Sequence, residues 1–585
     1  MNKLFYGIAI VIVASVTALG QTPTTDIVIS ETDIEKAGQS IPASSIGEPV
    51  SNVKLYPPRW VSATATMPAH AIVEGSIMSV DPNGWPINFR VILPASWSQR
   101  SMQLGGGGMN GTISASANGN NATLAKGFAL YGSDGGHQAG GGGFGGQQTK
   151  PLATGPTMGD EWTLNEEAMR NLAYMQMKKT HDAAMVIMER VYGKRPVYNY
   201  YVGGSQGGRE ALTVAQRYPQ DYNGIIADVP IVNFSSLMLA PTLMKIQEKP
   251  LQNWITPTKT EAIRMEFLRQ SDKLDGIADG IINNYIDSRA IFNVADADGP
   301  KDPWAALRAP NGVDPDPTDK SASAKLTNGQ IKTLELTYSP YKFATPLANG
   351  VKSFGMWLPT ISPDGFGMIS GTRYKAQEGA TENAGVYKTL GSEGVTGFLM
   401  QDIKANPLDY VEGGKLNKRR EEISTSLDAT NPDLSAFYAR GGKIMITIGT
   451  ADNIASPGAQ VDYYQSLINT MGRKKVDEFA RLYVVPQGGH GLSGKSYTVN
   501  GDGKSVEVKN IPAPNRDDKI DMIIAWTEGN KAPAKTLAID AKGRVNDKLE
   551  GEGYLLCSFP NYPKYVEGSD KLVSSYVSEK PKFTK

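Results

Sequence analysis

Apolar residues between positions 165 and 229 recur with periods that alternate between those of a helix and a strand. From Asn165 to Tyr192 they return every three or four residues, which is typical of an amphipathic helix. The β-branched and aromatic run Val197–Val202 predicts a strand, Arg209–Tyr218 predicts a second helix, and Gly224–Val229 predicts a second strand. A strand, a helix and a strand in this order predict a parallel βαβ unit.

Further strand-like runs lie on both sides of this unit. They are Trp60–Thr66, Ile87–Leu93, Gly127–Tyr131, Lys443–Ile448 and Arg481–Val485. Between residues 233 and 435 the chain is less regular and rich in Pro, Gly and Asp, so we interpret it as an insertion that forms a lid domain. Residues 21–232 and 436–585 would then build one α/β catalytic domain, in which residues 21 to about 50 are loosely held.

Ser205 lies between the first predicted strand and the second predicted helix, in Gly203-Gly204-Ser205-Gln206-Gly207. This segment matches the G-x-S-x-G nucleophile elbow, a sharp turn on which the serine takes a strained backbone conformation that requires small neighbours. The turn also directs a helix N-terminus at the serine, which favours negative charge that develops there. The motif predicts an α/β-hydrolase fold with Ser205 as the nucleophile, and a plain glycine-rich helix start is the alternative.

A serine nucleophile needs a base, and in the α/β-hydrolase order an acid and then a histidine follow it along the chain. The chain has four histidines, which are His70, His137, His181 and His490. Only His490 follows Ser205, directly after a predicted strand, although an exposed loop histidine is the alternative. Asp452 follows the preceding predicted strand and would orient the imidazole. Asp228 competes for this role, and Asp452 could instead serve as a turn or N-cap residue.

Two backbone N–H groups should bind the oxyanion of such a reaction. One is expected from Gln206, the residue after the nucleophile. The other is expected from the glycine-rich run Gly105–Gly108, at Gly107 or Gly108, because a backbone without side chains can approach the substrate oxygen. A flexible surface loop is the alternative. The run lacks the G-x-x-x-x-G-K-[ST] pattern of a phosphate-binding loop.

The N-terminus and the composition predict a location and exclude some partners. Lys3 precedes the short apolar run Leu4–Val16, and small residues allow cleavage before Gln21, so residues 1–20 predict a signal peptide. We therefore expect a secreted or periplasmic protein without stable membrane insertion, with a retained anchor as the alternative. The 59 basic and 59 acidic residues leave no basic excess for nucleic acid. Cys557 is the only cysteine, so no internal disulfide can form.

Three blocks of sequence resemble the tannase and feruloyl esterase family, which includes bacterial mono-(hydroxyethyl)terephthalate hydrolase. The family's nucleophile block is resembled by Tyr192–Lys194, Tyr201–Glu210 and Ala215–Pro219. Its acid block is resembled by Asp433–Lys443 and by Asp452 through Pro457 to Tyr464, and its histidine block by Arg481–Pro486 with Gly489-His490. The resemblance covers most of the chain after the signal. Family members typically have a disulfide between cysteines just before the nucleophile and just after the histidine. Here those positions are Gly204 and Gly491, so packing must hold the two loops together.

The resemblance also implies a structural calcium site in the lid, remote from the ester. Carboxylate and carbonyl oxygens with glycines for tight turns suit this hard cation. The ligands implied are three carboxylates and two backbone carbonyls, from Asp272, Asp275, Asp279, Ile277 and Ile281. An acidic turn without a metal is the alternative, and no organic cofactor is expected.

By this resemblance the chain is a serine esterase for small-molecule esters of aromatic acids, such as galloyl or feruloyl esters, acting through an acyl-enzyme. Terephthalate-type or aliphatic esters on the same triad are alternatives, and so is an exported binding protein that has lost turnover. Selectivity should lie in the lid. Four aromatic residues there either stack on a substrate ring or belong to the core, namely Phe354, Trp357, Phe366 and Tyr374.

Overall fold

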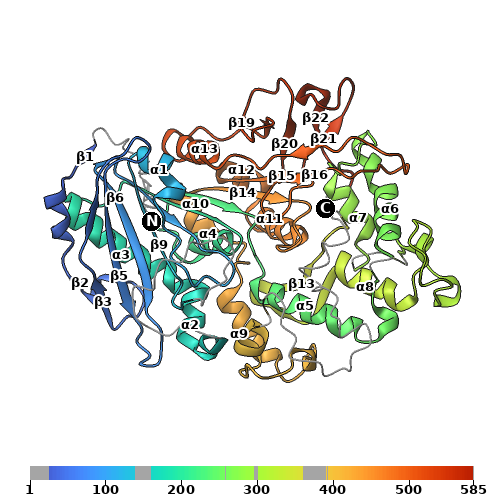
Figure 1. Cartoon of the computed structure of the whole chain (residues 1–585), viewed down its shortest axis with the longest axis horizontal. Helices are drawn as coiled ribbons and strands as arrows, with labels where there is room; N and C mark the ends of the chain where they lie inside the picture. Colours follow the sequence, from blue (N-terminus) through green and yellow to red (C-terminus); the bar gives the residue numbers. More distant parts are fainter. Residues whose placement is uncertain are drawn as a thin grey trace, which may run out of the picture.

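The computed structural model describes residues 26–138, 160–256, 259–295, 299, 301–359, 391 and 393–583, and a 14-stranded sheet runs through its centre (Figure 1). The predicted signal peptide and the lid residues Phe366 and Tyr374 lie outside these residues. From one edge to the other the sheet contains β19 (Val545–Asn546), β18 (Thr536–Ile539), β20 (Tyr554–Ser558), β15 (Ala480–Val485), β14 (Lys443–Gly449), β11 (Gly224–Asp228), β10 (Tyr198–Gly204), β8 (Arg100–Leu104), β9 (Phe128–Ser133), β6 (Ile87–Pro94), β5 (His70–Met78), β3 (Asn52–Leu55) and β2 (Ser40–Ile41), with β4 (Arg59–Val61) beside β5.

The middle of this sheet is parallel, and both of its margins are antiparallel. β9, β8, β10, β11, β14 and β15 are neighbours that all run in one direction. Their apolar runs are buried on both faces, since Ile225 and Ile226 of β11 pack into different core clusters. The carboxyl ends of parallel strands meet at one edge, where ligand sites of such sheets form. The loops after β8, β10, β14 and β15 therefore gather at that edge.

Helices cover the two faces of the sheet (Figure 1). Outside the predicted lid they are α1 (Asn121–Ala125), α2 (Glu166–Arg170), α3 (Gln176–Tyr192), α4 (Gln206–Arg217), α10 (Ser435–Ala439), α11 (Pro457–Met471), α12 (Arg473–Phe479) and α13 (Arg516–Gly529). The predicted helix 165–192 is interrupted, because a π-helical turn at Asn171–Met175 separates α2 from α3. The Arg209 guanidinium donates to the carbonyls of Leu172 and Ala173 within this turn. A side chain that hydrogen-bonds to the main-chain carbonyls of a helix is a known cause of such an irregularity.

The segment between β11 and β14 folds beside the sheet, in green to orange in Figure 1. Its elements are α5 (Phe234–Glu248), α6 (Thr260–Ser271), α7 (Tyr285–Phe292), α8 (Asn328–Tyr338), α9 (Asn417–Leu427) and the hairpin β12 (Pro340–Leu347) with β13 (Val351–Gly355). In its described residues this segment adds no strand to the central sheet. That arrangement is compatible with an inserted lid at residues 233–435, whose boundaries stay our interpretation.

Three features of the fold differ from expectation. Residues 26–50 are held firmly rather than loosely, because Ile34 and Ile41 are buried and Arg190 donates to the carbonyl of Ala37 at 2.7 Å. The strand expected over residues 60–66 is confined to β4. Short pairs that sequence periodicity did not predict complete the structure: β1 (Ile27–Val28) with β7 (Ser96–Trp97), β16 (Gly494–Lys495) with β17 (Asn510–Ile511), and β21 (Tyr562–Tyr565) with β22 (Tyr576–Glu579). Within the described ranges, no helix has the length and apolar character to cross a membrane.

Candidate active site

Ser205 occupies the turn between β10 and α4 in a strained conformation, with φ 59° and ψ −120°. A non-glycine residue held there costs on the order of 1–3 kcal/mol, which surrounding structure must offset. The neighbours have to be small. A Cβ on Gly203 would lie 2.4 Å from the carbonyl of Gly207, and one on Gly208 would lie 2.6 Å from the carbonyl oxygen of Asp228. The predicted elbow is therefore present, and its glycines are required sterically.

His490 links Ser205 to Asp452 in a continuous chain of hydrogen bonds. Its Nε2 lies 2.8 Å from Oγ of Ser205, and its Nδ1 lies 2.9 and 3.0 Å from the two carboxylate oxygens of Asp452. These residues come from the loops after β10, β15 and β14, which the parallel sheet brings to one edge. The arrangement can transfer a proton from the serine hydroxyl to an imidazole whose positive charge a carboxylate stabilises.

Asp452 is buried, and its local contacts keep it oriented toward the histidine. Burial raises the pKa of this carboxyl, whereas hydrogen bonding and charge attraction from His490 oppose the rise. The N–H groups of Ile454 and Ala455 also donate to its Oδ1, at 2.8 and 2.9 Å. Donors of this kind favour the ionised form that the imidazole needs.

Asp228, the competing acid, has a different partner. Its Oδ2 lies 2.6 Å from Nζ of Lys519 on α13, and its carbonyl oxygen accepts the N–H of Ser205 at 3.0 Å. The structure thus uses Asp228 to support the elbow rather than to contact His490. Sequence reasoning missed Lys519, because it lies 291 residues from its partner and nothing in the local pattern of α13 marks it.

Main-chain contacts hold the histidine loop to the acid loop. The N–H of Ala451 donates to the carbonyl of Gly488 at 2.9 Å, and the N–H of Thr450 donates to that of Val485 at 3.1 Å. Gly449 permits this approach, since a Cβ there would lie 2.2 Å from the carbonyl oxygen of Gly488. A Cβ at Gly491 would meet nothing within 4 Å. These backbone contacts hold the histidine loop against the acid loop.

The predicted oxyanion donors lie around the same edge. The N–H of Gly105 donates to Val202, and the carbonyl of Gly106 accepts the N–H of Gly207 at 3.0 Å. Within the described residues, no hydrogen bond engages the N–H groups of Gly107, Gly108 or Gln206. A Cβ on Gly107 or Gly108 would meet nothing within 4 Å, so these two glycines border open space. Among the described residues, these three N–H groups therefore have no competing acceptor.

The residues of the implied calcium site are buried together in the lid. Asp272, Asp275 and Asp279 are each at most 5% exposed. Burial raises the pKa of Asp275 to about 8 and that of Asp272 to about 6, and the neighbouring carboxylates add to both increases. Lys509 contributes one cation, 2.7 Å from Oδ2 of Asp279. No hydrogen bond among the described residues reaches the carbonyls of Ile277 or Ile281.

A second acidic group already has its cation. In the described part of the chain, only His181, Asp182 and Asp221 bring three potential metal ligands within 4.8 Å of one another. Nζ of Lys178 lies 2.9 Å from both Asp182 and Asp221. Nδ1 of His181 lies 2.8 Å from the hydroxyl of Tyr131. Lys178 therefore already neutralises this group. The lid carboxylates do not meet the same 4.8 Å spacing, so they would have to move closer together to bind an ion.

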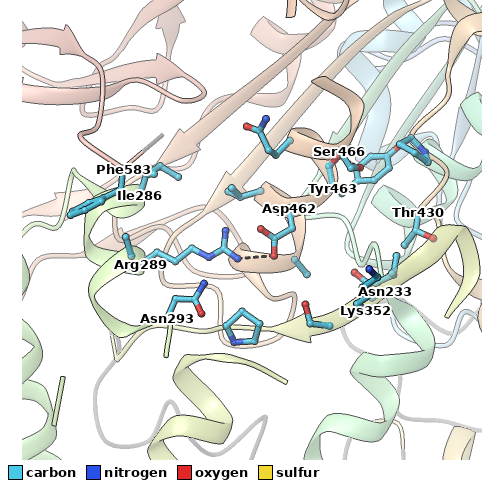
Figure 2. A pocket seen from close by; sticks show the side chains of 18 of the residues that line it. Asn233, Ile286, Arg289, Asn293, Lys352, Thr430, Asp462, Tyr463, Ser466 and Phe583 are labelled. Carbon is cyan, nitrogen blue, oxygen red and sulfur yellow. Dashed lines mark hydrogen bonds and ion pairs between the residues drawn. The ribbon is translucent and has the colours of Figure 1, made fainter. Parts of the chain in front are cut away.

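A cavity of about 1030 Å³ lies between α7, β13 and α11, and no residue of the serine, histidine and aspartate group lines it. Figure 2 shows Arg289 of α7 facing Asp462 of α11 in this cavity, where the two side chains pair at 2.6 Å. Phe354 and Trp357 are buried in the adjoining core, with ring centroids 5.5 Å apart. These two aromatic residues are therefore core residues in this structure.

Comparison with known proteins gives consistent matches over most of the chain. The family model described as tannase and feruloyl esterase matches residues 71–579. An uncharacterized esterase of Agrobacterium fabrum is 30% identical, with 93% of this chain and 92% of the relative covered. The mono(2-hydroxyethyl) terephthalate hydrolase of Piscinibacter sakaiensis is 26% identical, with 87% and 84% covered.

Solved structures show the same fold. Feruloyl esterase B from Aspergillus oryzae superposes with a TM-score of 0.68 at 20% identity, covering 91% of this chain and 98% of that one. Tannin acyl hydrolase from Aspergillus niger superposes with a TM-score of 0.63 at 19% identity, covering 96% of each chain. The α/β-hydrolase fold and the extent of the family match agree with the resemblance in sequence. This chain is a carboxylic ester hydrolase that belongs to the tannase and feruloyl esterase family.

Proposed function

We propose that the chain hydrolyses esters of aromatic acids with Ser205 as nucleophile, His490 as general base and acid, and Asp452 as the orienting carboxylate. The observation that carries this proposal is the continuous hydrogen-bond chain from Asp452 through His490 to Oγ of Ser205. Its distances lie within the reach that proton transfer and nucleophile activation need.

The proposed reaction has two half-reactions. Oγ of Ser205 attacks the ester carbonyl while His490 takes the hydroxyl proton, and the same proton then protonates the leaving alcohol. The resulting acyl-enzyme is hydrolysed by a water that His490 deprotonates. The N–H groups of Gln206 and of Gly107 or Gly108 would stabilise the oxyanion in both steps. The absence of any other acceptor for these N–H groups among the described residues supports this role.

The substrate class is the finer part of the proposal. Relatives with named activities include a mono(2-hydroxyethyl) terephthalate hydrolase, feruloyl esterases and a tannase, whose substrates are esters of aromatic acids. These activities share an aromatic acyl group and differ in the acid. We therefore assign the class of aromatic acyl esters rather than one acid.

The test is hydrolysis of methyl gallate, methyl ferulate and a terephthalate half-ester, with an aliphatic ester of similar size for comparison. Turnover of an aromatic ester that Ser205→Ala abolishes is expected. A fluorophosphonate should label the wild type and not the variant. Labelling without turnover of any aromatic ester would reject the substrate class and keep the nucleophile. Unchanged turnover by Ser205→Ala would reject the mechanism.

We also propose a structural Ca²⁺ held by the side chains of Asp272, Asp275 and Asp279 and the carbonyls of Ile277 and Ile281. Three buried carboxylates share a single described cation, Lys509, and no hydrogen bond from a described residue reaches the two carbonyls. An oxygen-only donor set of this kind suits Ca²⁺. A chelator should lower the melting temperature, and Ca²⁺ should restore it. An unchanged melting temperature with no calcium found by elemental analysis would reject the site.

Export is proposed from the first residues alone. Cleavage by a signal peptidase is supported by Lys3, by the apolar run Leu4–Val16 and by the small residues before Gln21. N-terminal sequencing of the protein recovered outside the cytoplasm should begin at Gln21. A mature chain that begins at Met1 would reject the signal peptide.

A further inference from the structure

We propose that Glu210 is a positioning residue that keeps the two sides of the oxyanion site in register. The inference rests on the proposed function of Ser205. Glu210 lies on α4, little more than one helical turn after Ser205, and is 1% exposed. Its charge takes no part in the proton transfers proposed above. A buried carboxylate is costly unless its surroundings require it, so its contacts identify its role.

The Glu210 carboxylate collects five hydrogen-bond donors. Oε2 accepts the Gly106 N–H at 3.0 Å and the Tyr201 hydroxyl at 2.9 Å. Oε1 accepts donors from three side-chain amides, at 2.7 Å from Asn110, 3.0 Å from Gln176 and 3.4 Å from Gln206. These donors belong to four segments: the glycine-rich loop, which comprises residues 105–110 after β8, and the elements β10, α3 and α4. One carboxylate thus joins four segments of the chain near the proposed oxyanion donors.

The two oxygens of a carboxylate match this set of donors. Its two oxygens offer acceptor sites alone, whereas a glutamine presents one oxygen and one NH₂ group. With glutamine at position 210, the NH₂ group would face donors at one of the two oxygen positions. Buried donors without an acceptor cost about 1–3 kcal/mol each, so the neighbouring segments would move to relieve the conflict.

The glycine-rich loop is the segment that such a movement would displace. Gly106 is held twice, by its N–H to Glu210 and by its carbonyl to the N–H of Gly207, each at 3.0 Å. The carbonyl of Gly106 and the N–H of Gly107 belong to one planar peptide unit. The hydrogen bonds of Gly106 therefore set the direction of the Gly107 N–H.

Gln206, on the other side of the site, is held through its side chain. Its Nε2 lies 3.4 Å from Oε1 of Glu210, and its Oε1 accepts Nε of Arg209 at 2.8 Å. Both predicted sources of oxyanion donors thus contact the same carboxylate. Loss of the carboxylate should misalign donors that matter in the transition state and should leave ground-state binding nearly unchanged.

The decisive experiment compares wild type with Glu210→Gln, at equal amounts of active sites titrated with a fluorophosphonate. We expect kcat to fall about 10- to 100-fold, somewhat less than the loss of one oxyanion donor, and KM to change less than about threefold. A boronic acid inhibitor forms a tetrahedral adduct on the serine, so its affinity should fall by a factor close to that for kcat/KM.

Glu528→Gln is the matched control. The side chain of Glu528 is 7% exposed. It accepts hydrogen bonds from Arg100 and Tyr200, which lie in the amino-terminal halves of β8 and β10, whereas Ser205 follows the carboxyl end of β10. This variant should lose stability and keep its kcat. Tyr201→Phe removes one donor to Glu210 that does not belong to the loop, so it should lower the melting temperature with less than about a threefold effect on kcat.

Two outcomes would overturn the role of Glu210. One is a kcat per titrated site within about threefold of wild type in Glu210→Gln, and the other is an equal loss in Glu528→Gln. If Glu210→Gln does not fold, Asn110→Gly decides, since glycine tolerates the φ of 65° at Asn110 and the hydrogen bond from its amide to Glu210 is lost. A several-fold lower kcat in that variant supports the role, and an unchanged kcat rejects it. Activity that survives Ser205→Ala would instead refute the proposed function.

Discussion

Replacing Gly449 with alanine should disable the enzyme without touching any residue of the proposed triad. Gly449 ends β14, where a Cβ would lie 2.2 Å from the carbonyl oxygen and 2.6 Å from the carbonyl carbon of Gly488. Ordinary van der Waals contact begins at 3.4 Å, so the backbone of the histidine loop has to move by about 3.4 − 2.2 = 1.2 Å. No flexible side chain is available to absorb the overlap.

The displacement would act on the contact between Asp452 and His490. These residues follow Gly449 and Gly488 closely in the chain, and their hydrogen bonds measure 2.9 and 3.0 Å. A separation larger by 1 Å is no longer a hydrogen bond. Misplacement on this scale costs about 10²-fold in rate, and complete loss of the orienting carboxylate costs about 10⁴-fold. We expect kcat to fall between these limits, with about 1–3 kcal/mol of destabilisation from overpacking.

Hydrolysis of a chromogenic ester, normalised to sites titrated with a fluorophosphonate, measures this loss. Gly491→Ala is the control, because a Cβ beside His490 at that position meets nothing within 4 Å and φ is not in the left-handed region. The control should keep kcat within about threefold of wild type. A Gly449→Ala variant with wild-type kcat and melting temperature would show that the close packing of these loops does not position His490.

Three further predictions concern charged groups. Asp452→Asn should lower kcat about 10⁴-fold. Asp228→Asn breaks the pair with Lys519, so it should lower the melting temperature and reduce kcat far less than Asp452→Asn does. Burial lowers the pKa of His181 to about 4 from 6.5, so the unfolded chain binds more protons in this window and stability falls as the pH drops through it. Urea titrations measure how much free energy of unfolding the protein loses between pH 7 and pH 4. This loss should be about 3 kcal/mol smaller in His181→Gln than in wild type, and equal losses would refute the assignment. Asp275→Asn should abolish the response of the melting temperature to Ca²⁺, and a retained response would exclude Asp275 as a ligand.

Much of the candidate site could be predicted because its signals are local. The elbow needs small residues on both sides of a strained serine, and Gly203 and Gly208 show that requirement directly in the sequence. Chain order then selected His490, since no other histidine follows Ser205. The parallel core could also be predicted, because strands buried on both faces have continuous apolar runs.

The antiparallel margins of the sheet could not be predicted in the same way. β18 and β20 are short, and their pairing depends on the partner strand rather than on a pattern of their own. The N-terminal residues 26–50 are polar in composition, yet Ile34 and Ile41 are buried against the rest of the fold. A few apolar residues suffice when a surface is already present to cover them.

The sequence by itself determined the elbow at Ser205, the chain order of the proposed nucleophile, acid and base, and the parallel strands that carry them, because each depends on neighbours along the chain. Only the tertiary structure distinguishes Asp452 from Asp228, because both residues follow a strand. In the fold, His490 contacts Asp452, whereas Lys519 contacts Asp228. The tertiary structure also decided the contacts of Glu210, whose donors come from four separate segments. Such long-range pairing is invisible in local periodicity, because it depends on which chain segments the folded sheet brings together.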